Sequence, residues 1–300
     1  MSTTTLEKSH AEPAPAVRSR RTRPRGERGP LGAALLHGGL VLASLVALAP
    51  VGWLFFLSLG PDKDDYLHPG AIAGKTTFAN YRFVLEHTPF FDWLKSTMIV
   101  ALGTTLIGVF VAATTGYAVS RMRFPGYRSL MWVLLLTQAF PIAILIVPMY
   151  EIFGELGLID TYWGLIIINC TTAVPYSAWL LKGYFDTIPF EIDEAGRVDG
   201  LTPFGTFARL ILPLARPGLA VAAFYNFITA VGEVAFATTF MLDDSNYTFA
   251  VGLQSFISEH DAQWNYMAAT AVLIAIPVSV FFYLVQKNLV TGLTAGGTKG

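Results

Sequence analysis

The residues whose types and spacing could do chemistry lie mainly in a polar insert between Glu194 and Pro213, where carboxylates stand beside glycines and prolines that interrupt helices. Such residues suit contacts with a partner. Catalytic patterns are missing, since the sequence has no phosphate-cradling G-x-x-x-x-G-K-[ST] loop, no G-x-S-x-G and no H-E-x-x-H. Its five histidines lack metal-ligand spacing, and its one cysteine, Cys170, lies in an apolar run. We therefore expect no catalytic residue, metal site or cofactor on this chain.

Two short helices joined by a turn are expected to position the insert. Pro189 suits the first turn of a helix, and Glu194 adds negative charge near its positive end. Gly200 is expected to stop this helix, because glycine takes the left-handed conformation at little cost. Thr202 can cap a second helix with Pro203 in its first position.

The second short helix carries aromatic residues at helical spacing. We expect Phe204 and Phe207 to be exposed beside the turn, forming a knob that implies a socket on a partner. An amphipathic helix lying on lipid headgroups would show the same pattern. The residues alone leave these two alternatives open.

The rest of the chain has the composition of an all-α polytopic membrane protein. Of its 300 residues 53% are hydrophobic and only 14% are charged, whereas soluble chains have about a quarter charged residues. The net charge of -1 implies no attraction to nucleic acid. Six windows reach the length of roughly 20 apolar residues that a membrane span needs. They are approximately 31–59, 96–120, 130–150, 162–181, 218–242 and 266–286.

The distribution of charge predicts the orientation of these spans. Lysine and arginine are concentrated before the first span, between spans two and three, between spans four and five, and after span six. The links between spans three and four and between five and six carry acidic residues but no Lys or Arg. By the positive-inside rule both termini are cytoplasmic.

Three parts of the chain follow from this topology. Residues 1–30 form a basic cytoplasmic tail expected to be disordered. Residues 31–290 form the transmembrane domain, with a cytoplasmic insert at 186–213 and an external loop at 243–263. Residues 291–300 form a glycine-rich cytoplasmic tail.

Glu233 is the one carboxylate inside an expected span. Intramembrane charge is costly, so Glu233 is a candidate for lining a pathway or for bonding to a neighbouring helix, with a direct part in transport chemistry as the alternative. An ion-coupled secondary transporter is an alternative class for the whole chain, but it predicts several intramembrane charges and an inverted repeat, which the sequence lacks.

The insert resembles the EAA loop of bacterial ABC importer permeases. That motif reads E-A-A, three residues, G, nine residues, I-x-L-P, and here it reads Glu194-Ala195-Gly196, then Gly200, then Leu210-Ile211-Leu212-Pro213. Gly196 stands where the motif has its second alanine, and Leu210 stands where it has isoleucine. The spacing is intact.

Further segments narrow the resemblance to carbohydrate importers, and within them to the smaller, MalG-type permease of maltose/maltodextrin transporters. The matching stretches are 121–126, 228–234, 247–254 and the closing run 292–300. The resemblance implies a type I ABC importer permease in the bacterial cytoplasmic membrane. It also implies transport of maltose or maltodextrins by alternating access, with trehalose or another oligosaccharide as the near alternative.

The same resemblance implies partners and contact residues. The insert would be a coupling helix that binds a MalK-type ATPase homodimer carrying ATP and Mg. The other implied partners are a MalF-type second permease, an extracytoplasmic sugar-binding protein and membrane lipid. The implied ATPase-coupling residues are Glu194, Ala195, Gly196, Asp199, Gly200, Phe204 and Pro213. The implied ATPase-contacting tail is Thr294, Ala295, Gly296 and Gly297. The implied binding-protein contact loop is Ile257, Ser258, Glu259, His260 and Asp261.

Overall fold

The computed structural model describes residues 30–62, 69–72, 74–122, 124–257 and 262–295. Regular structure in these residues is helical, apart from one isolated antiparallel bridge between Ile257 and Ala262. The expectation of an all-α chain is therefore confirmed. The chain divides after Pro50 into two compact units, which are described separately.

In the first unit the described residues are 30–50, which belong to helix α1 (Pro30–Ser58). The span Leu31–Ser58 has a mean hydropathy of 2.4. Its large apolar side chains, such as Leu35 and Val46, are exposed. An apolar helix with exposed side chains suits a lipid environment, and this agrees with the first expected span.

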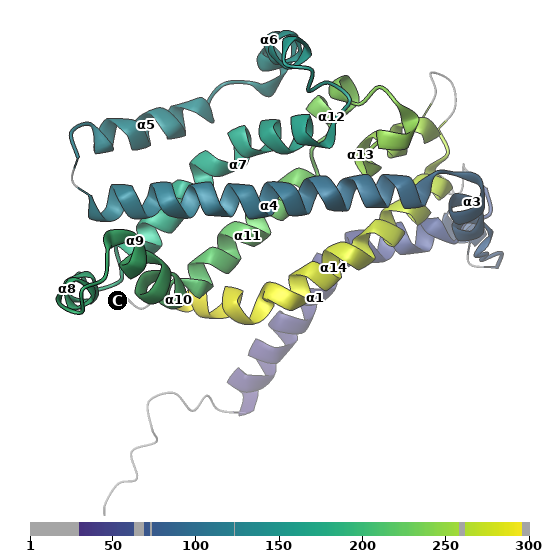
Figure 1. Cartoon of the computed structure of the whole chain (residues 1–300). Helices are drawn as coiled ribbons and strands as arrows, with labels where there is room; N and C mark the ends of the chain where they lie inside the picture. The colour runs from purple at the N-terminus through teal and green to yellow at the C-terminus, as the bar shows by residue number, and fades with distance from the viewer. Residues whose placement is uncertain (1–29, 63–68, 73, 123, 258–261, 296–300) are drawn as a thin grey trace, which may run out of the picture. The chain divides into compact units, whose positions relative to one another are not determined.

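The second unit contains the remaining helices, and Figure 1 shows their arrangement. In chain order they are α2 (Pro69–Ile72), α3 (Ala79–His87), α4 (Phe90–Arg121), α5 (Tyr127–Thr137), α6 (Ile142–Glu155), α7 (Tyr162–Phe185), α8 (Glu191–Val198), α9 (Pro203–Thr206), a π-helical turn (Phe207–Ile211), α10 (Leu212–Leu214), α11 (Arg216–Val231), α12 (Ala235–Phe240), α13 (Phe249–Gly252) and α14 (Trp264–Ala295), with short 3₁₀ turns at Asp244–Asn246 and Leu253–Phe256.

Helices α4, α7 and α11 form the centre of this unit, and α14 packs against α11. Small residues line the contact, including Ala112 and Ala113 of α4 and Ala178 of α7, all of them buried. Small side chains let helices approach closely where lipid removes the usual hydrophobic driving force. A polar contact adds to the packing, because Ser177 Oγ donates to Asn226 Oδ1 over 2.6 Å.

Four described helices are long and apolar enough to cross a membrane, or up to six elements if each of two bent pairs counts as one span. The windows at 96–120, 162–181 and 266–286 each fall within one continuous helix, namely α4, α7 and α14. Pro175 lies inside α7 and Pro277 inside α14. Both proline residues are therefore tolerated inside continuous helices.

The third and fifth expected spans are not continuous helices in the structure. Helices α5 and α6 meet at 101°, with Pro141 directly before α6. Proline cannot continue a helix from the preceding turn, because it has no N–H and its ring clashes with that turn. The window 218–242 is also interrupted, since α11 ends at Val231 and α12 begins at Ala235. A sharp bend of 83° separates the stretch Pro203–Leu214 from α11.

Candidate functional site

The polar insert folds as the predicted helix–turn–helix, formed by α8 and α9. Glu191, Asp193 and Glu194 lie in the first turn of α8, where they complement the positive end of the helix. At the other end Gly200 adopts a φ of 77°, the left-handed conformation expected of a helix stop. The Leu201 N–H donates to Gly196 O over 2.9 Å, and this bond satisfies a carbonyl that the helix leaves free.

The second half of the turn also follows its local signals. Thr202 caps α9, because its Oγ1 accepts a hydrogen bond of 3.1 Å from the Gly205 N–H, and Pro203 occupies the first turn. A π-helical turn follows from Phe207 to Ile211. Such turns are rare in proteins, and those that occur are often found at functional sites. Pro213 is exposed in the short helix α10 that precedes the bend into α11.

The two short helices pack against each other at Gly196. This residue is buried, and a Cβ added to it would lie 2.7 Å from Thr206 Oγ1 and 3.1 Å from Leu210 Cδ1. The contact leaves no room for a methyl group unless Thr206 shifts. The absence of a side chain at Gly196 therefore allows α8 to pack closely against Thr206 and Leu210.

One side of this hairpin remains exposed. Glu194, Ala195, Asp199 and Gly200 are exposed there. Phe204 is 66% exposed. These residues form a projection of mixed acidic and apolar character, which we call the α8–α9 tip.

Phe207 corrects the prediction of two exposed aromatic residues. Its side chain is only 4% exposed, and its ring centroid lies 4.7 Å from that of Tyr117 on α4. Phe185 of α7 also packs against it. Phe207 thus anchors the hairpin to two long helices and is part of the core, while Phe204 alone projects.

A buried ion pair fastens α8 to the end of α4. Arg121 Nε lies 3.0 Å from Asp193 Oδ2, with the arginine side chain 9% exposed and the aspartate side chain 3% exposed. The Tyr117 hydroxyl donates to Asp193 Oδ1 over 2.7 Å, so both carboxylate oxygens have a partner. Arg121 Nη2 also donates to Ile188 O over 2.9 Å, just before α8. The hairpin is therefore tied to α4 by charge and by hydrogen bonds.

Sequence analysis missed this anchor. Arg121 stood there only within a basic link, and Asp193 was given no role. The position of Arg121 at the end of a long apolar segment could have indicated the ion pair, because a charge at that boundary needs either a partner or solvent.

Glu233 lies between α11 and α12, and its contacts favour the helix-bonding alternative. Its Oε1 accepts a hydrogen bond from the Phe236 N–H over 2.7 Å, and its Oε2 accepts one from the Ala237 N–H over 2.9 Å. A carboxylate in this position satisfies N–H groups that the first turn of a helix leaves free. Glu233 therefore caps α12.

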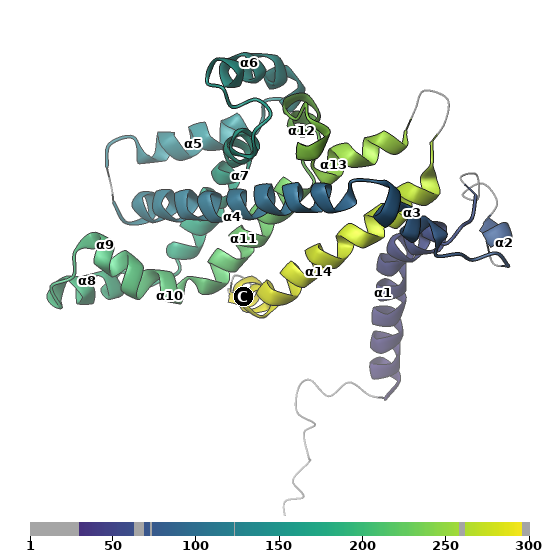
Figure 2. The same ribbon diagram turned by 45° about the vertical axis from the view of Figure 1, so that its right-hand side comes forward.

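The expected external loop lies at the opposite end of α4 from the α8–α9 tip, as Figures 1 and 2 show for α13 and α8. The Phe249 N–H donates to Thr97 Oγ1 of α4 over 2.8 Å. Asp160 Oδ1 accepts hydrogen bonds from the Leu242 and Asp243 N–H groups at 3.1 and 3.2 Å. Ile257 is exposed at the end of the described part of this loop. Ser258, Glu259, His260 and Asp261 lie outside the described residues.

The C-terminal tail is described only in part. Helix α14 continues to Ala295, so Thr294 and Ala295 belong to its last turn, beyond the limit of 290 expected for the transmembrane domain. Gly296 and Gly297 lie outside the described residues. Among the described residues no cluster of His, Cys, Asp or Glu is arranged to hold a metal.

The long apolar helices of this architecture define a polytopic membrane protein. Residues 104–294 match the family described as "Binding-protein-dependent transport system inner membrane component", and the chain belongs to that family. Its place in the inner membrane and the resemblance to ABC importer permeases are thereby confirmed. A family defined by a separate binding protein does not support the alternative of an ion-coupled secondary transporter.

Named relatives share most of their length with this chain. The maltodextrin transport system permease protein MdxG of Bacillus subtilis is 38% identical over 76% of this chain and 82% of its own length. The trehalose transport system permease protein SugB of Mycobacterium tuberculosis is 37% identical over 87% of this chain and 96% of its own length. The maltose/maltodextrin transport system permease protein MalG of Escherichia coli is 39% identical over 81% of this chain and 84% of its own length.

A solved structure supports the fold. A chain of the bacterial ABC transporter involved in import of the acidic polysaccharide alginate superposes with a TM-score of 0.68 at 21% identity, covering 86% of this chain and 96% of that chain. This likeness shows a shared fold. Together with the family match, it confirms the expected class of ABC importer permease.

Proposed function

We propose that this chain is the permease subunit of an ATP-driven importer for maltose and maltodextrins, and that its α8–α9 tip is the coupling helix. The observation that carries the proposal is the joint between Arg121 and Asp193, because it links an exposed projection to the end of a membrane-spanning helix. A force applied to the tip is passed to α4 through a buried contact. A loosely attached amphipathic segment would have no such connection.

The tip supplies the chemistry that docking needs. Phe204 offers an exposed aromatic ring for a pocket on the ATPase, while Glu194 and Asp199 offer carboxylates for hydrogen bonds or ion pairs at its rim. Ala195 is small and exposed, and Gly200 lets the chain turn within one residue. Pro213 ends the motif before the bend into α11. The tip would dock into a cleft on one ATPase subunit, and closure of the ATPase dimer on ATP and Mg would move it.

The remaining proposed partners lie on the two sides of the membrane and beside this chain within it. A MalF-type permease would pair with this chain, and a MalK-type homodimer would bind both coupling helices and hydrolyse ATP, so that this chain itself is not catalytic. The loop at 257–261 would meet the sugar-binding protein. The C-terminal segment 294–297 would contact the ATPases, its glycines permitting close approach. In this arrangement 1–30 and 291–300 are cytoplasmic tails of a transmembrane domain at 31–290.

Maltodextrin is the preferred substrate because the MdxG and MalG relatives carry that name and match long segments of this chain. Trehalose is the second candidate, favoured by the relative SugB over 96% of its length. The described residues supply no built sugar site that separates them. Stimulation of ATP hydrolysis by each sugar, with the cognate binding protein present, distinguishes the two.

The coupling proposal is tested by replacing Glu194 with alanine and Gly200 with valine in the assembled transporter. We expect sugar-stimulated ATP hydrolysis and uptake to fall together while the permease still assembles in the membrane. Arg82→Gln serves as a control, since Arg82 forms an exposed pair with Glu86 on α3, far from the tip. Normal coupling in both tip variants would count against the docking role.

A further inference from the structure

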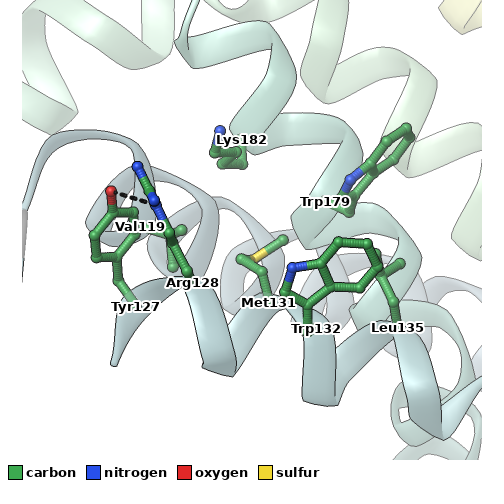
Figure 3. A pocket seen from close by; sticks show the side chains of 8 residues that line it. All are labelled: Val119, Tyr127, Arg128, Met131, Trp132, Leu135, Trp179 and Lys182. Carbon is green, nitrogen blue, oxygen red and sulfur yellow. Dashed lines mark hydrogen bonds between the residues drawn. The ribbon is translucent and has the colours of Figure 1, made fainter. Parts of the chain in front are cut away.

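A cavity lies beside the end of α4 that carries the ion pair. It is a cavity of about 340 Å³ between the end of α4, the start of α5 and the end of α7. Its walls combine aromatic, aliphatic and basic side chains, as Figure 3 shows. They are Val119, Tyr127, Arg128, Met131, Trp132, Leu135, Trp179 and Lys182.

One end of the cavity is cationic. Arg128 Nε donates to the Tyr127 hydroxyl over 3.1 Å, and within the described residues its guanidinium forms no ion pair with a carboxylate. Lys182 lies on the wall formed by α7, and its Nζ is 2.6 Å from Asp186 Oδ2. Asp186 also accepts a hydrogen bond from Ser120 Oγ over 2.6 Å, so its charge is shared. Arg128 therefore brings a positive charge that the described residues leave unbalanced.

The other end is aromatic and open. Trp132 is 68% exposed and Trp179 is 50% exposed, and Figure 3 shows both at the end away from Tyr127 and Arg128. Met131, buried at 8% exposure, lies between the two ends. Tryptophan is enriched where a membrane meets water, because its ring is apolar and its N–H is polar.

The position of the cavity suits the boundary between membrane and water. Arg121 is the last residue of α4, Tyr127 is the first of α5, and Lys182 lies in the last turn of α7. Polar or basic residues thus mark this end of all three helices, as expected where helices leave a lipid bilayer. The ion pair between Arg121 and Asp193 places the cavity on the same side as the α8–α9 tip.

We propose that this cavity binds the phosphate group of an anionic phospholipid from the leaflet that faces the ATPases. Arg128 would hold the phosphate through two N–H donors, and Lys182 would add a third, since arginine suits bidentate binding of phosphate. The acyl chains would run along Met131, Leu135 and the two tryptophans. The assignment to that leaflet rests on the proposed coupling role of the tip, whereas the binding chemistry does not.

An anionic lipid suits the walls better than a protein segment does. None of the eight lining residues is acidic, and the cationic end passes directly into an exposed apolar end. A phospholipid has the same order of groups. A free phosphate ion would use the cationic end and leave the aromatic end empty.

The test is native mass spectrometry of the assembled transporter from nanodiscs of phosphatidylcholine containing a small fraction of phosphatidylglycerol. We expect the wild type to retain phosphatidylglycerol in preference to phosphatidylcholine. Arg128→Gln should weaken retention roughly tenfold, as expected for loss of a charge-assisted contact. Arg216→Gln, a loss of an exposed arginine of α11 outside the cavity, should leave retention unchanged.

Three outcomes would overturn the proposal. The first is equal retention by wild type and Arg128→Gln. The second is displacement of the lipid by inorganic phosphate at millimolar concentration, which would identify an ion site. The third is a cross-link from Trp132→Cys to the second permease, which would identify a protein interface. Lipid retention is measured without sugar or ATP, so failure of the transport proposal would be seen separately.

Discussion

Arg121 Nε lies 3.0 Å from Asp193 Oδ2, and this pair joins the last residue of α4 to the first turn of α8. Because both side chains are almost fully buried, neither charge is well solvated without the other. Removal of one partner from a buried pair typically costs about 3–5 kcal/mol, whereas loss of an exposed pair costs little. Loss of either partner is therefore expected to disrupt the attachment of the α8–α9 tip to α4, on which the proposed coupling role depends.

The first prediction concerns that link. Asp193→Asn should reduce sugar-stimulated ATP hydrolysis and uptake, because the Arg121 charge loses its counter-charge and α8 loosens from α4. Arg121→Met combined with Asp193→Leu should restore folding better than either single change, since no buried charge then lacks a partner. The measurements are the yield of assembled transporter and the number of ATP molecules hydrolysed per sugar imported.

These variants separate folding from coupling. We expect the double variant to assemble well yet hydrolyse more ATP per sugar than wild type, because packing replaces the directional ion pair. Arg82→Gln, which removes an exposed pair, should leave both quantities unchanged. A double variant with wild-type efficiency would show that the ion pair has only a structural role.

The second prediction concerns the contact between Gly196 and Thr206. Gly196→Ala should destabilise the hairpin, because the new methyl would lie 2.7 Å from Thr206 Oγ1. Overpacking of this kind costs about 1–3 kcal/mol. Thr206→Ala removes the clashing atoms, so the double variant should recover. Limited proteolysis of the insert and transport-coupled ATP hydrolysis measure the effect.

A cycle of the two single variants and the double variant isolates the coupling between these positions. Thr206→Ala alone should be mild, since its hydroxyl is buried without a hydrogen-bond partner in the described residues. Equal damage by Gly196→Ala in the presence and absence of Thr206 would exclude the steric explanation.

The third prediction concerns Phe204. Phe204→Ala should leave the fold intact, because the side chain is 66% exposed, but should weaken assembly with the ATPase dimer. Truncation of an aromatic anchor at an interface commonly costs about 2 kcal/mol or more, which is over tenfold in affinity. Binding of the purified ATPase to permease complexes in nanodiscs gives the affinity directly.

Phe78→Ala is the matched control for Phe204. Phe78 is also strongly exposed, at 70%, but it directly precedes α3, which lies with α13 at the opposite end of the second unit. We expect its loss to leave ATPase binding unchanged. If the two variants weaken binding equally, general damage to the permease explains the result and the tip is not the docking element.

The sequence allowed prediction where the signal is local. The residue type at Gly200 predicts a left-handed backbone conformation, and the residue type at Thr202 predicts a helix cap. The helix–turn–helix could therefore be predicted from residue types. Whether Phe207 is buried depends on Tyr117 and Phe185, which are distant in the chain, and the prediction of exposure was wrong. The bond between Tyr117 and Asp193 joins residues 76 positions apart, and no local pattern reports it. A window of apolar residues likewise shows length but not direction, so it missed the 101° bend between α5 and α6.

The last prediction separates the two roles considered for Glu233. As a cap, its carboxylate accepts hydrogen bonds from the Phe236 and Ala237 N–H groups, so Glu233→Ala should destabilise α12 by about 1–2 kcal/mol. Glu233→Gln keeps one oxygen acceptor and should retain more activity than Glu233→Ala. Since a cap takes no part in proton movement, uptake measured from pH 5 to pH 8 should keep its wild-type profile in Glu233→Gln, with a uniform reduction in rate. A profile that loses its pH dependence, or uptake that responds to a proton gradient in wild type but not in Glu233→Gln, would instead assign Glu233 to the transport pathway.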